Sequence, residues 1–453
     1  MGTARGSDSF MYDSIRTETA YPKLITELRR GEAPVCINGL SASRKAVFVD
    51  ALTDLSPWSL YITTDEKEAA EVQADLSTFD DNAWIYPARD LLFYSSDVHG
   101  NFIRNQRSDA LRHLLEDDHG ILITTVQGLM DKIPSRQSVT KDVLTLSEAL
   151  VIPVKDLIRV MNRLGYERVP EVEAMGQYSV RGGIVDIFPM TSEFPVRVEF
   201  FDDEIDTIRT FDTETKRSVE RIKDVEIFPA EPGRGEVSLL DYFEKKSLVF
   251  ADDPVRLKAL CELTEAEFRE AFLRRAEAHK NSRGDVFEDA EDQIADIFST
   301  NEIMERLAQP GTVYFAPLDD SLKEFGAKKA FRFNTGASGN YKDSIQLLAD
   351  DIKRYEHDKY RITVMTPSHT RMSRLAETLR EQGIHAYIPD ETSGELKPGT
   401  TEVVFGRLRE GYTAPDIRYV LFTESDMFGK ELVKKRRRRN SKARSWEAWT
   451  SFP

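Results

Sequence analysis

Residues 178–211 read YSVRGGIVDIFPMTSEFPVRVEFFDDEIDTIRTF, and this stretch decides how the chain is organised. Apolar and polar residues alternate in three segments, at 178–188, 196–201 and 205–211. Such alternation predicts consecutive strands. The segment 189–195, which begins and ends with proline, and the pair Asp202-Asp203 predict the turns between them. The stretch therefore predicts a small antiparallel sheet in the middle of the chain.

The sequence on the N-terminal side of this sheet has a different pattern. Short apolar runs alternate with helical segments between residues 34 and 134. The apolar runs are at 35–38, 60–63, 84–86 and 121–125, and the helical segments are at 45–55, 66–76 and 126–133. This alternation is typical of a parallel sheet covered by helices on both faces. We expect an α/β domain here, with a helix at about 154–164 leading into the antiparallel strands.

The C-terminal side returns to helix and then to a second α/β pattern. Residues 239–307 predict helix, and 313–315 predict a strand. The second pattern predicts helices at 344–355 and 370–382 and strands at 362–366, 403–405 and 419–423. The expected fold class is α/β multidomain: a parallel-sheet domain with an inserted small antiparallel α+β domain, followed by a second small α/β domain.

These patterns divide the chain into five segments. We expect the first part of the parallel-sheet domain at 1–150, the inserted domain at 151–235, the second and largely helical part of the first domain at 236–335, the small α/β domain at 336–430, and a disordered basic tail at 431–453. Because residues 239–307 follow the insertion, they are expected to pack back onto the first domain and leave the inserted sheet projecting.

Charge and composition exclude several classes of protein. The 453 residues carry a formal net charge of −16, so any contact with nucleic acid must be local. No apolar run approaches the roughly 20 residues of a membrane span, and no signal peptide is recognisable. We expect a cytoplasmic monomer with no membrane partner. Cys36 and Cys261 are too few for a disulfide framework or a zinc site and are expected to be buried, reduced thiols.

Residues 39–46, GLSASRKA, have the spacing of a phosphate-binding loop between the first strand and its helix. In such a loop the second glycine lets N–H groups surround a phosphate, and the final hydroxyl binds magnesium. Gly39 and Lys45 fit, but Arg44 and Ala46 stand at those two positions, so hydrolysis is expected to fail. The segment is an ordinary strand-to-helix turn, a degenerate nucleotide loop or a working one. No catalytic or metal-binding residue is assigned.

The strand at 196–201 predicts one buried and one polar face. Alternation places Val196, Val198 and Phe200 toward the core and Arg197, Glu199 and Phe201 on the opposite face. An exposed aromatic beside an arginine is typical of an interface hot spot. Arg181, on the preceding strand, is expected to join them. The alternative is that a helix covers Phe201 while Arg197 pairs with Glu199 or Asp186.

Three stretches in this region resemble a known module: LGYERV at 164–169, GQYSVRGGIVDIFP at 176–189 and PVRVEFFDDEID at 195–206. The module is shared by UvrB and the bacterial transcription-repair coupling factors. Other stretches resemble the first and third domains of the coupling factors and favour them over UvrB. These are TTVQGLM at 124–130, GRLREGY at 406–412 and TESDMFG at 423–429. The resemblance spans residues 21–439.

The resemblance implies an adaptor without an ATPase of its own. The inserted domain of the family binds UvrA, the damage-sensing subunit of nucleotide excision repair, and the docking residues carry over to Arg181, Arg197 and Phe201. The first domain is implied to be degenerate and helicase-like, in agreement with Arg44 and Ala46. The implied function is recruitment of UvrA to stalled transcription.

The chain also departs from a complete coupling factor. The polymerase-binding and translocase domains, through which RNA polymerase, DNA and ATP would bind, are absent, so no cofactor is expected. Residues 440–453 do not resemble the family, and a truncated fragment is expected. Two alternatives are a nucleotide-hydrolysing helicase-like fragment that uses Lys45, and a DNA-binding protein that uses the basic run 434–439. That run otherwise fits a solvated tail.

Overall fold

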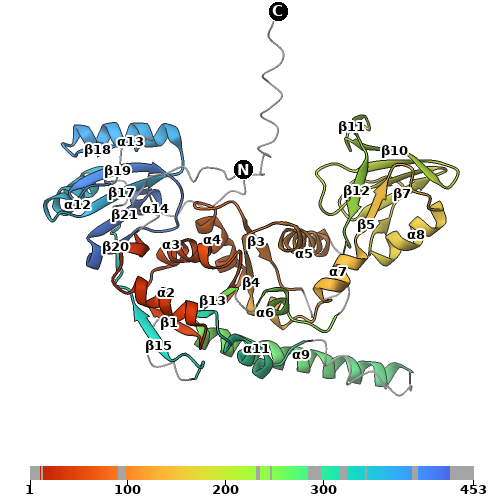
Figure 1. Ribbon diagram of the computed structural model, residues 1–453, viewed down its shortest axis with the longest axis horizontal. Coiled ribbons are helices and arrows are strands. Elements are labelled where there is room, and N and C mark those ends of the chain that lie inside the picture. The colour runs from red at the N-terminus through yellow and green to blue at the C-terminus, as the bar shows by residue number, and fades with distance from the viewer. Residues whose placement is uncertain are drawn as a thin grey trace, which may run out of the picture.

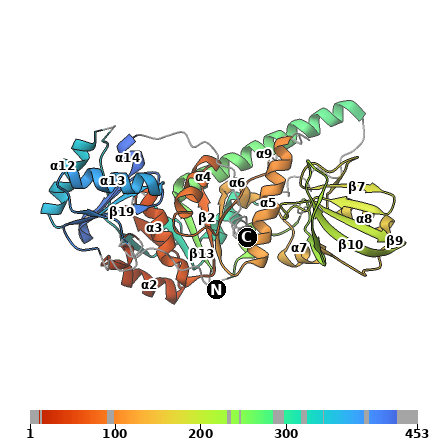
Figure 2. The same ribbon diagram turned by 90° about the horizontal axis from the view of Figure 1, so that it is seen from above.

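The computed structural model describes residues 11, 14–89, 98–230, 235–244, 247–283, 297–316, 324–341, 344–389 and 396–428. Three units lie in a row (Figure 1), and Figure 2 shows the same order from above. The central unit comprises the described residues of 14–143 and 235–333. The inserted unit comprises 144–230, and the C-terminal unit comprises the described residues of 334–428. The basic run and the tail at 431–453 lie outside the described residues.

The central unit is built on a seven-stranded sheet in which all paired strands run parallel. In spatial order the strands are β15 (Lys329–Arg332), β1 (Val35–Asn38), β14 (Thr312–Phe315), β13 (Leu248–Asp252), β2 (Trp58–Thr63), β4 (Gly120–Thr125) and β3 (Ala83–Tyr86). The inner strands are almost wholly buried. The parallel pairing confirms the predicted α/β class of this domain. Continuous apolar strands of this kind are typical of parallel sheets that are covered on both faces.

Helices cover both faces of the central sheet. One core contains residues of α2 (Tyr21–Arg30), α3 (Ala42–Leu52) and α4 (Glu66–Leu76), and the other contains residues of α5 (Val98–Glu116), α6 (Val126–Met130), α9 (Pro254–Arg283) and α11 (Thr300–Leu307). Shorter helical elements are η1 (Ile15–Thr17), η2 (Thr53–Leu55), α7 (Arg136–Asp142) and η3 (Leu239–Tyr242). The segment after the insertion thus packs back onto the central unit, as predicted.

The helical prediction for residues 239–307 was wrong in one place. Strand β13 lies within this segment and pairs with β2 and β14 near the middle of the sheet. Its apolar run, at 248–251, is only four residues long and stands between helical segments, so its periodicity does not distinguish strand from helix. The edge strand β15 was also not predicted, since most of its residues are exposed and carry little apolar signal.

The inserted unit is a six-stranded sheet with one helix. In spatial order the strands are β11 (Ser218–Ile222), β10 (Glu204–Phe211), β9 (Val196–Phe201), β8 (Ile184–Ile187), β7 (Gln177–Arg181) and β6 (Glu167–Arg168). All neighbours are antiparallel except β6 and β7. Helix α8 (Val154–Arg163) packs on one face, where the apolar core of this unit lies. The inserted antiparallel α+β domain is therefore confirmed.

The prediction of one strand over 178–188 was wrong. A two-residue turn at Gly182-Gly183 divides it into β7 and β8, which pair as a hairpin. Gly182 has a φ of 62°, a conformation that glycine adopts without steric cost. The chain enters and leaves the unit through an antiparallel pair, β5 (Leu144–Ser147) and β12 (Asp224–Ile227). This pair leaves the sheet projecting from the central unit (Figure 1).

The C-terminal unit contains a second six-stranded sheet. In spatial order its strands are β16 (Gly336–Ala337), β20 (Tyr412–Ala414), β21 (Tyr419–Thr423), β17 (Arg361–Thr366), β19 (Thr400–Phe405) and β18 (Ala386–Tyr387). Its helices are α12 (Ile345–His357), α13 (His369–Glu381) and α14 (Glu424–Phe428), with η5 (Pro415–Ile417) before β21. The second α/β domain is thus confirmed. Tyr412, Tyr419 and Leu421 share a core with α3 of the central unit.

Two further findings concern the described residues as a set. Cys36 and Cys261 are buried and form no disulfide, as predicted. No helix in the described ranges has both the length and the apolar character needed to cross a membrane.

Candidate partner-binding site

The polar face of the inserted sheet is organised around one buried carboxylate. Asp186 of β8 lies directly opposite Arg197 of β9. The Arg197 guanidinium donates to both carboxylate oxygens, at 2.7 Å through Nε and 2.9 Å through Nη2. Arg181 donates to the same carboxylate through Nη2, at 2.6 Å. One buried acid therefore holds two of the three residues that the sequence singled out.

The two arginines differ in how much of the guanidinium group remains available to a partner. The Arg197 side chain is 22% exposed and lies over the Phe211 ring, with 4.7 Å between the guanidinium carbon and the ring centroid. Its hydrogen bonds to Asp186 raise the pKa of the guanidinium above its usual value. The Arg181 side chain is 51% exposed and uses one nitrogen for Asp186. Since a guanidinium carries five N–H donors, Arg181 keeps several for a partner.

Phe201 stands on the same face at the end of β9. Its side chain is 79% exposed, while Val196 and Val198 on the opposite face are fully buried. The turn after it passes through Asp202 with a φ of 58°. The predicted division of β9 into a core face and a polar face is confirmed. The alternative interpretation was wrong in expecting a helix to cover Phe201. It was right in expecting Arg197 to pair with Asp186.

A second polar cluster on this face was missed by the sequence reasoning. The Glu199 carboxylate accepts from the Thr207 hydroxyl at 2.9 Å and from the Arg209 guanidinium at 3.1 Å. Thr207 and Arg209 belong to β10, where they pair with Glu199 and Arg197 of β9. Cross-strand neighbours of this kind follow from register, so the predicted β9–β10 hairpin was the signal that pointed to them. The cluster extends the hydrogen-bonded polar face onto β10.

The loop at 39–46 lies in the central unit, away from this face. Gly39 follows β1 with a φ of 79°, and a side chain there would overlap the Phe333 carbonyl oxygen. Arg44 is fully buried and forms an ion pair with Glu18. Its Nη1 also donates to the Asn334 carbonyl at 2.8 Å and to the Thr335 hydroxyl at 2.7 Å. Arg44 therefore ties the loop to the start of the C-terminal unit.

The other loop residues are also engaged with the protein itself. Lys45 Nζ donates to Asp252 Oδ1 at the end of β13, over 2.6 Å. Ala46 is buried in the core below the helix. At the first turn of α3, the N–H of Ala42 donates to the Glu410 carboxylate over 3.1 Å. A carboxylate of the C-terminal unit thus stands at the helix N-terminus, where a phosphate-binding loop receives its phosphate.

The cavity beside the loop has a volume of about 340 Å³ and an acidic lining. Its charged residues are Asp65, Glu68, Asp252, Asp253, Lys45 and Arg256. Four carboxylates against two cations repel a polyphosphate unless metal ions intervene. Within the described ranges, no group of three or more His, Cys, Asp or Glu residues is placed to hold a metal ion.

A comparison with known protein families gives a match whose bounds are close to those of the inserted unit. Residues 144–232 match the model of the UvrB interaction domain. The unit inserted into the parallel α/β unit is therefore similar to the UvrB interaction domain.

The curated relatives narrow this similarity. The transcription-repair-coupling factor of Staphylococcus aureus (strain bovine RF122 / ET3-1) is 24% identical over 474 residues, covering 90% of this chain and 39% of the relative. That of Bacillus subtilis (strain 168) is 22% identical over 489 residues, covering 94% and 41%. The resemblance to the N-terminal region of the transcription-repair coupling factors is confirmed. The chain spans about two fifths of the length of these relatives.

Solved structures overlap more loosely. S. tokodaii Xpd4 covers 87% of this chain and 80% of its own, with 11% identity and a TM-score of 0.30. The DUF1998 helicase MrfA bound to DNA covers 85% and 39%, with 10% identity and a TM-score of 0.26. TM-scores of this size do not establish a shared arrangement of domains.

Proposed function

We propose that this chain is the adaptor part of a transcription-repair coupling factor, and that its inserted unit recruits UvrA to stalled transcription for nucleotide excision repair. The observation that carries the proposal is the exposed Phe201 on the same face of the sheet as the two arginines held by Asp186. An exposed aromatic side chain that shares a face with arginine donors is the composition of an interface hot spot. The match of residues 144–232 to the UvrB interaction domain supports the same assignment.

Preorganisation supports the choice of these residues over other exposed ones. Arg197 is fixed by a bidentate ion pair and by the Phe211 ring, so little side-chain freedom is lost when a partner binds. Phe201 extends from a paired strand rather than from a loop. Elements that are rigid before binding raise affinity by lowering the entropic cost of association.

The adaptor acts without hydrolysing nucleotide. Arg44, Lys45 and the N-terminus of α3 are all engaged by groups of the chain itself, and carboxylates dominate the cavity beside them. Contacts with RNA polymerase and DNA, and ATP-driven movement, belong on this proposal to the parts of the coupling factors that this chain does not span.

The test is binding of purified UvrA to the chain, measured by isothermal titration calorimetry. The double variant Arg197→Ala, Phe201→Ala is expected to weaken binding about 30-fold or more, because truncating a hot-spot residue costs about 2 kcal/mol. The matched control is Val219→Ala, which truncates an exposed apolar side chain on β11 of the same sheet and is expected to leave affinity unchanged.

Circular dichroism and thermal unfolding of each variant report whether the sheet is intact. Unchanged affinity in a folded double variant contradicts the assigned site. Absence of binding by the parent chain contradicts the adaptor function itself.

A further inference from the structure

A second cavity lies in the C-terminal unit, with a volume of about 670 Å³. It opens beyond the carboxyl ends of three parallel strands, since Thr366 ends β17, Gly406 follows β19 and Thr423 ends β21. After β17 the chain runs toward β18, and after β19 it returns to the opposite side to form β20 and β21. Ligands of open α/β sheets bind in the crevice at such a reversal.

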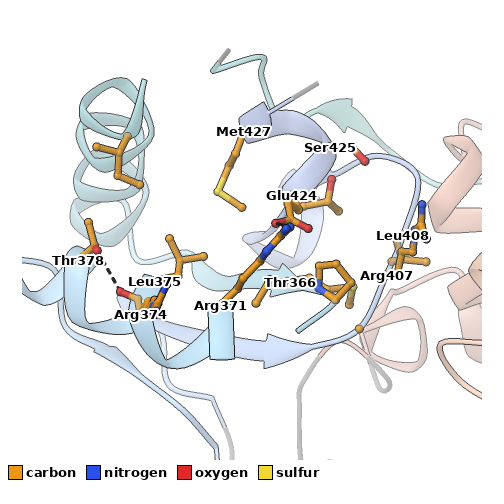
Figure 3. Close-up of a pocket in the computed structure, with 15 residues that line it drawn as sticks. Thr366, Arg371, Arg374, Leu375, Thr378, Arg407, Leu408, Glu424, Ser425 and Met427 are labelled. Carbon is orange, nitrogen blue, oxygen red and sulfur yellow. Dashed lines mark hydrogen bonds and ion pairs between the residues drawn. The ribbon is translucent and has the colours of Figure 1, made fainter. Parts of the chain in front are cut away.

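Three arginines line this cavity (Figure 3). Arg371, in the first turn of α13, pairs with Glu424 at the start of α14. Arg374 lies three residues further along α13, and Arg407 follows β19. Both are exposed, and no ion pair or hydrogen bond within the described ranges engages either guanidinium. The charged lining, with three arginines and Glu424, therefore favours an anion.

Thr366 supplies a second observation at the wall of this cavity. Thr366 is 1% exposed and lines the cavity, yet its Oγ1 has no hydrogen-bond partner among the described residues. A buried hydroxyl without a partner is unfavourable, because it has lost its contact with water. Its neighbourhood is fixed: the Gly406 N–H donates to the Thr366 carbonyl at 3.0 Å, which sets Arg407 beside this strand end.

The remaining lining is apolar and suits the body of an organic ligand. The apolar side chains are Ile345, Met365, Leu375, Leu408 and Met427. Thioether groups pack well against aromatic rings. The volume falls within the range of about 300–1,000 Å³ that small-molecule sites occupy. The cavity thus combines donors for an anion with an apolar wall for a flat group.

We propose that this cavity binds a nucleoside phosphate. Phosphate oxygens accept hydrogen bonds from Arg374, Arg407 and the Thr366 hydroxyl, near the positive N-terminal end of the 13-residue helix α13. The base packs against the apolar wall, and Glu424 accepts from a ribose hydroxyl or a base amine. The site is separate from the loop at 39–46, whose cavity is acidic.

The experiment titrates the full chain with ADP and AMP by calorimetry, with adenosine and inorganic phosphate titrated separately. The double variant Arg374→Ala, Arg407→Ala is expected to weaken ADP binding about tenfold or more. Thr366→Val is expected to weaken it, and Thr366→Ser to retain it, since serine keeps the hydroxyl. Arg354→Ala, an exposed arginine of α12 outside the cavity, is the control.

Each outcome decides the proposal. Loss of ADP binding in the folded double variant with retention in Lys45→Ala supports it. Loss of ADP binding in Lys45→Ala, with retention in the double variant, places the nucleotide at the loop 39–46 and overturns the proposal. Equal affinity for adenosine and ADP also overturns it, because the phosphate then contributes nothing. A single-stranded oligonucleotide, titrated in parallel, distinguishes a free nucleotide from a nucleic-acid strand as the source of the phosphate. If the oligonucleotide competes with ADP and this competition requires Arg374 and Arg407, the site binds the phosphate of a strand.

Discussion

Arg44 in the loop of the central unit and Arg197 in the inserted sheet are both held by carboxylates, but with opposite consequences. Arg44 is fully buried with Glu18 and bridges to residues 334 and 335, so it closes a place where a ligand would enter. Arg197 keeps part of its surface open, on the same face as the exposed Phe201. The same kind of ion pair thus stabilises packing in one unit and, in the proposed function, holds a docking residue in place in the other.

The largest expected effect comes from Arg44→Ala. Removing the cation leaves Glu18 buried without its partner, and breaking a buried pair costs about 3–5 kcal/mol. Urea denaturation followed by circular dichroism measures the change. The surface variant Arg354→Ala, in which an exposed side chain loses its pair with the half-buried Asp351, should cost less than about 1 kcal/mol. An equally small loss for Arg44→Ala would remove the distinction between the two arginines.

A smaller effect is expected from Asp186→Asn. The neutral side chain keeps the shape but replaces one of the two acceptor oxygens by an N–H donor. The bonds to Arg181 and Arg197 are weakened, at a cost of about 2 kcal/mol for a buried site. UvrA affinity should fall as well, because Arg197 loses its fixed position. Asp206→Asn, at an exposed position of β10, is the matched control. If both variants behave alike in urea denaturation and UvrA titration, Asp186 does not organise the face.

Acidification should lower the stability of the central unit through two carboxyl groups of α9 and α11. The N–H groups of Thr300 and Ser299 lower the pKa of Glu265 and Glu302, respectively. Because these carboxyl groups have a lower pKa when folded, their stabilisation is present above pH of about 4.5 and is lost as pH falls through the lowered pKa values.

The double variant Glu265→Gln, Glu302→Gln should therefore lose less than about 1 kcal/mol at pH 7 and show a flatter dependence of stability between pH 7 and pH 3. Urea unfolding at each pH measures this. Glu305→Gln, an exposed residue of α11, provides the reference, and a parent-like acid dependence in the double variant contradicts the assignment.

The smallest expected effect concerns Lys45. Because Lys45 is paired with Asp252, ATP turnover by the chain should be the same in the parent and in Lys45→Ala. A coupled phosphate-release assay with magnesium measures it. ATP turnover by the parent that disappears in Lys45→Ala would show that the loop works. The loop of the central unit would then not be closed to ligands.

Much of the fold was predictable because it follows from local periodicity. The helix at 66–76 and the strand at 419–423 were placed with their observed bounds. Strand β13 was not, because a four-residue apolar run acquires its identity only by pairing with β2 and β14. Gly182-Gly183 carried a turn signal that the prediction overlooked.

The sequence by itself determined which side chains of β9 face outward, because successive side chains of a strand point to opposite faces. It also determined that Arg44 and Ala46 stand where a phosphate loop has glycine and a hydroxyl. Only the tertiary structure decided what these residues touch. Glu410 reaches the N-terminus of α3 from a position 368 residues away in the chain. The cavity with Thr366, Arg374 and Arg407 forms only when separate strand ends meet, and contacts of this range depend on packing that no local pattern encodes.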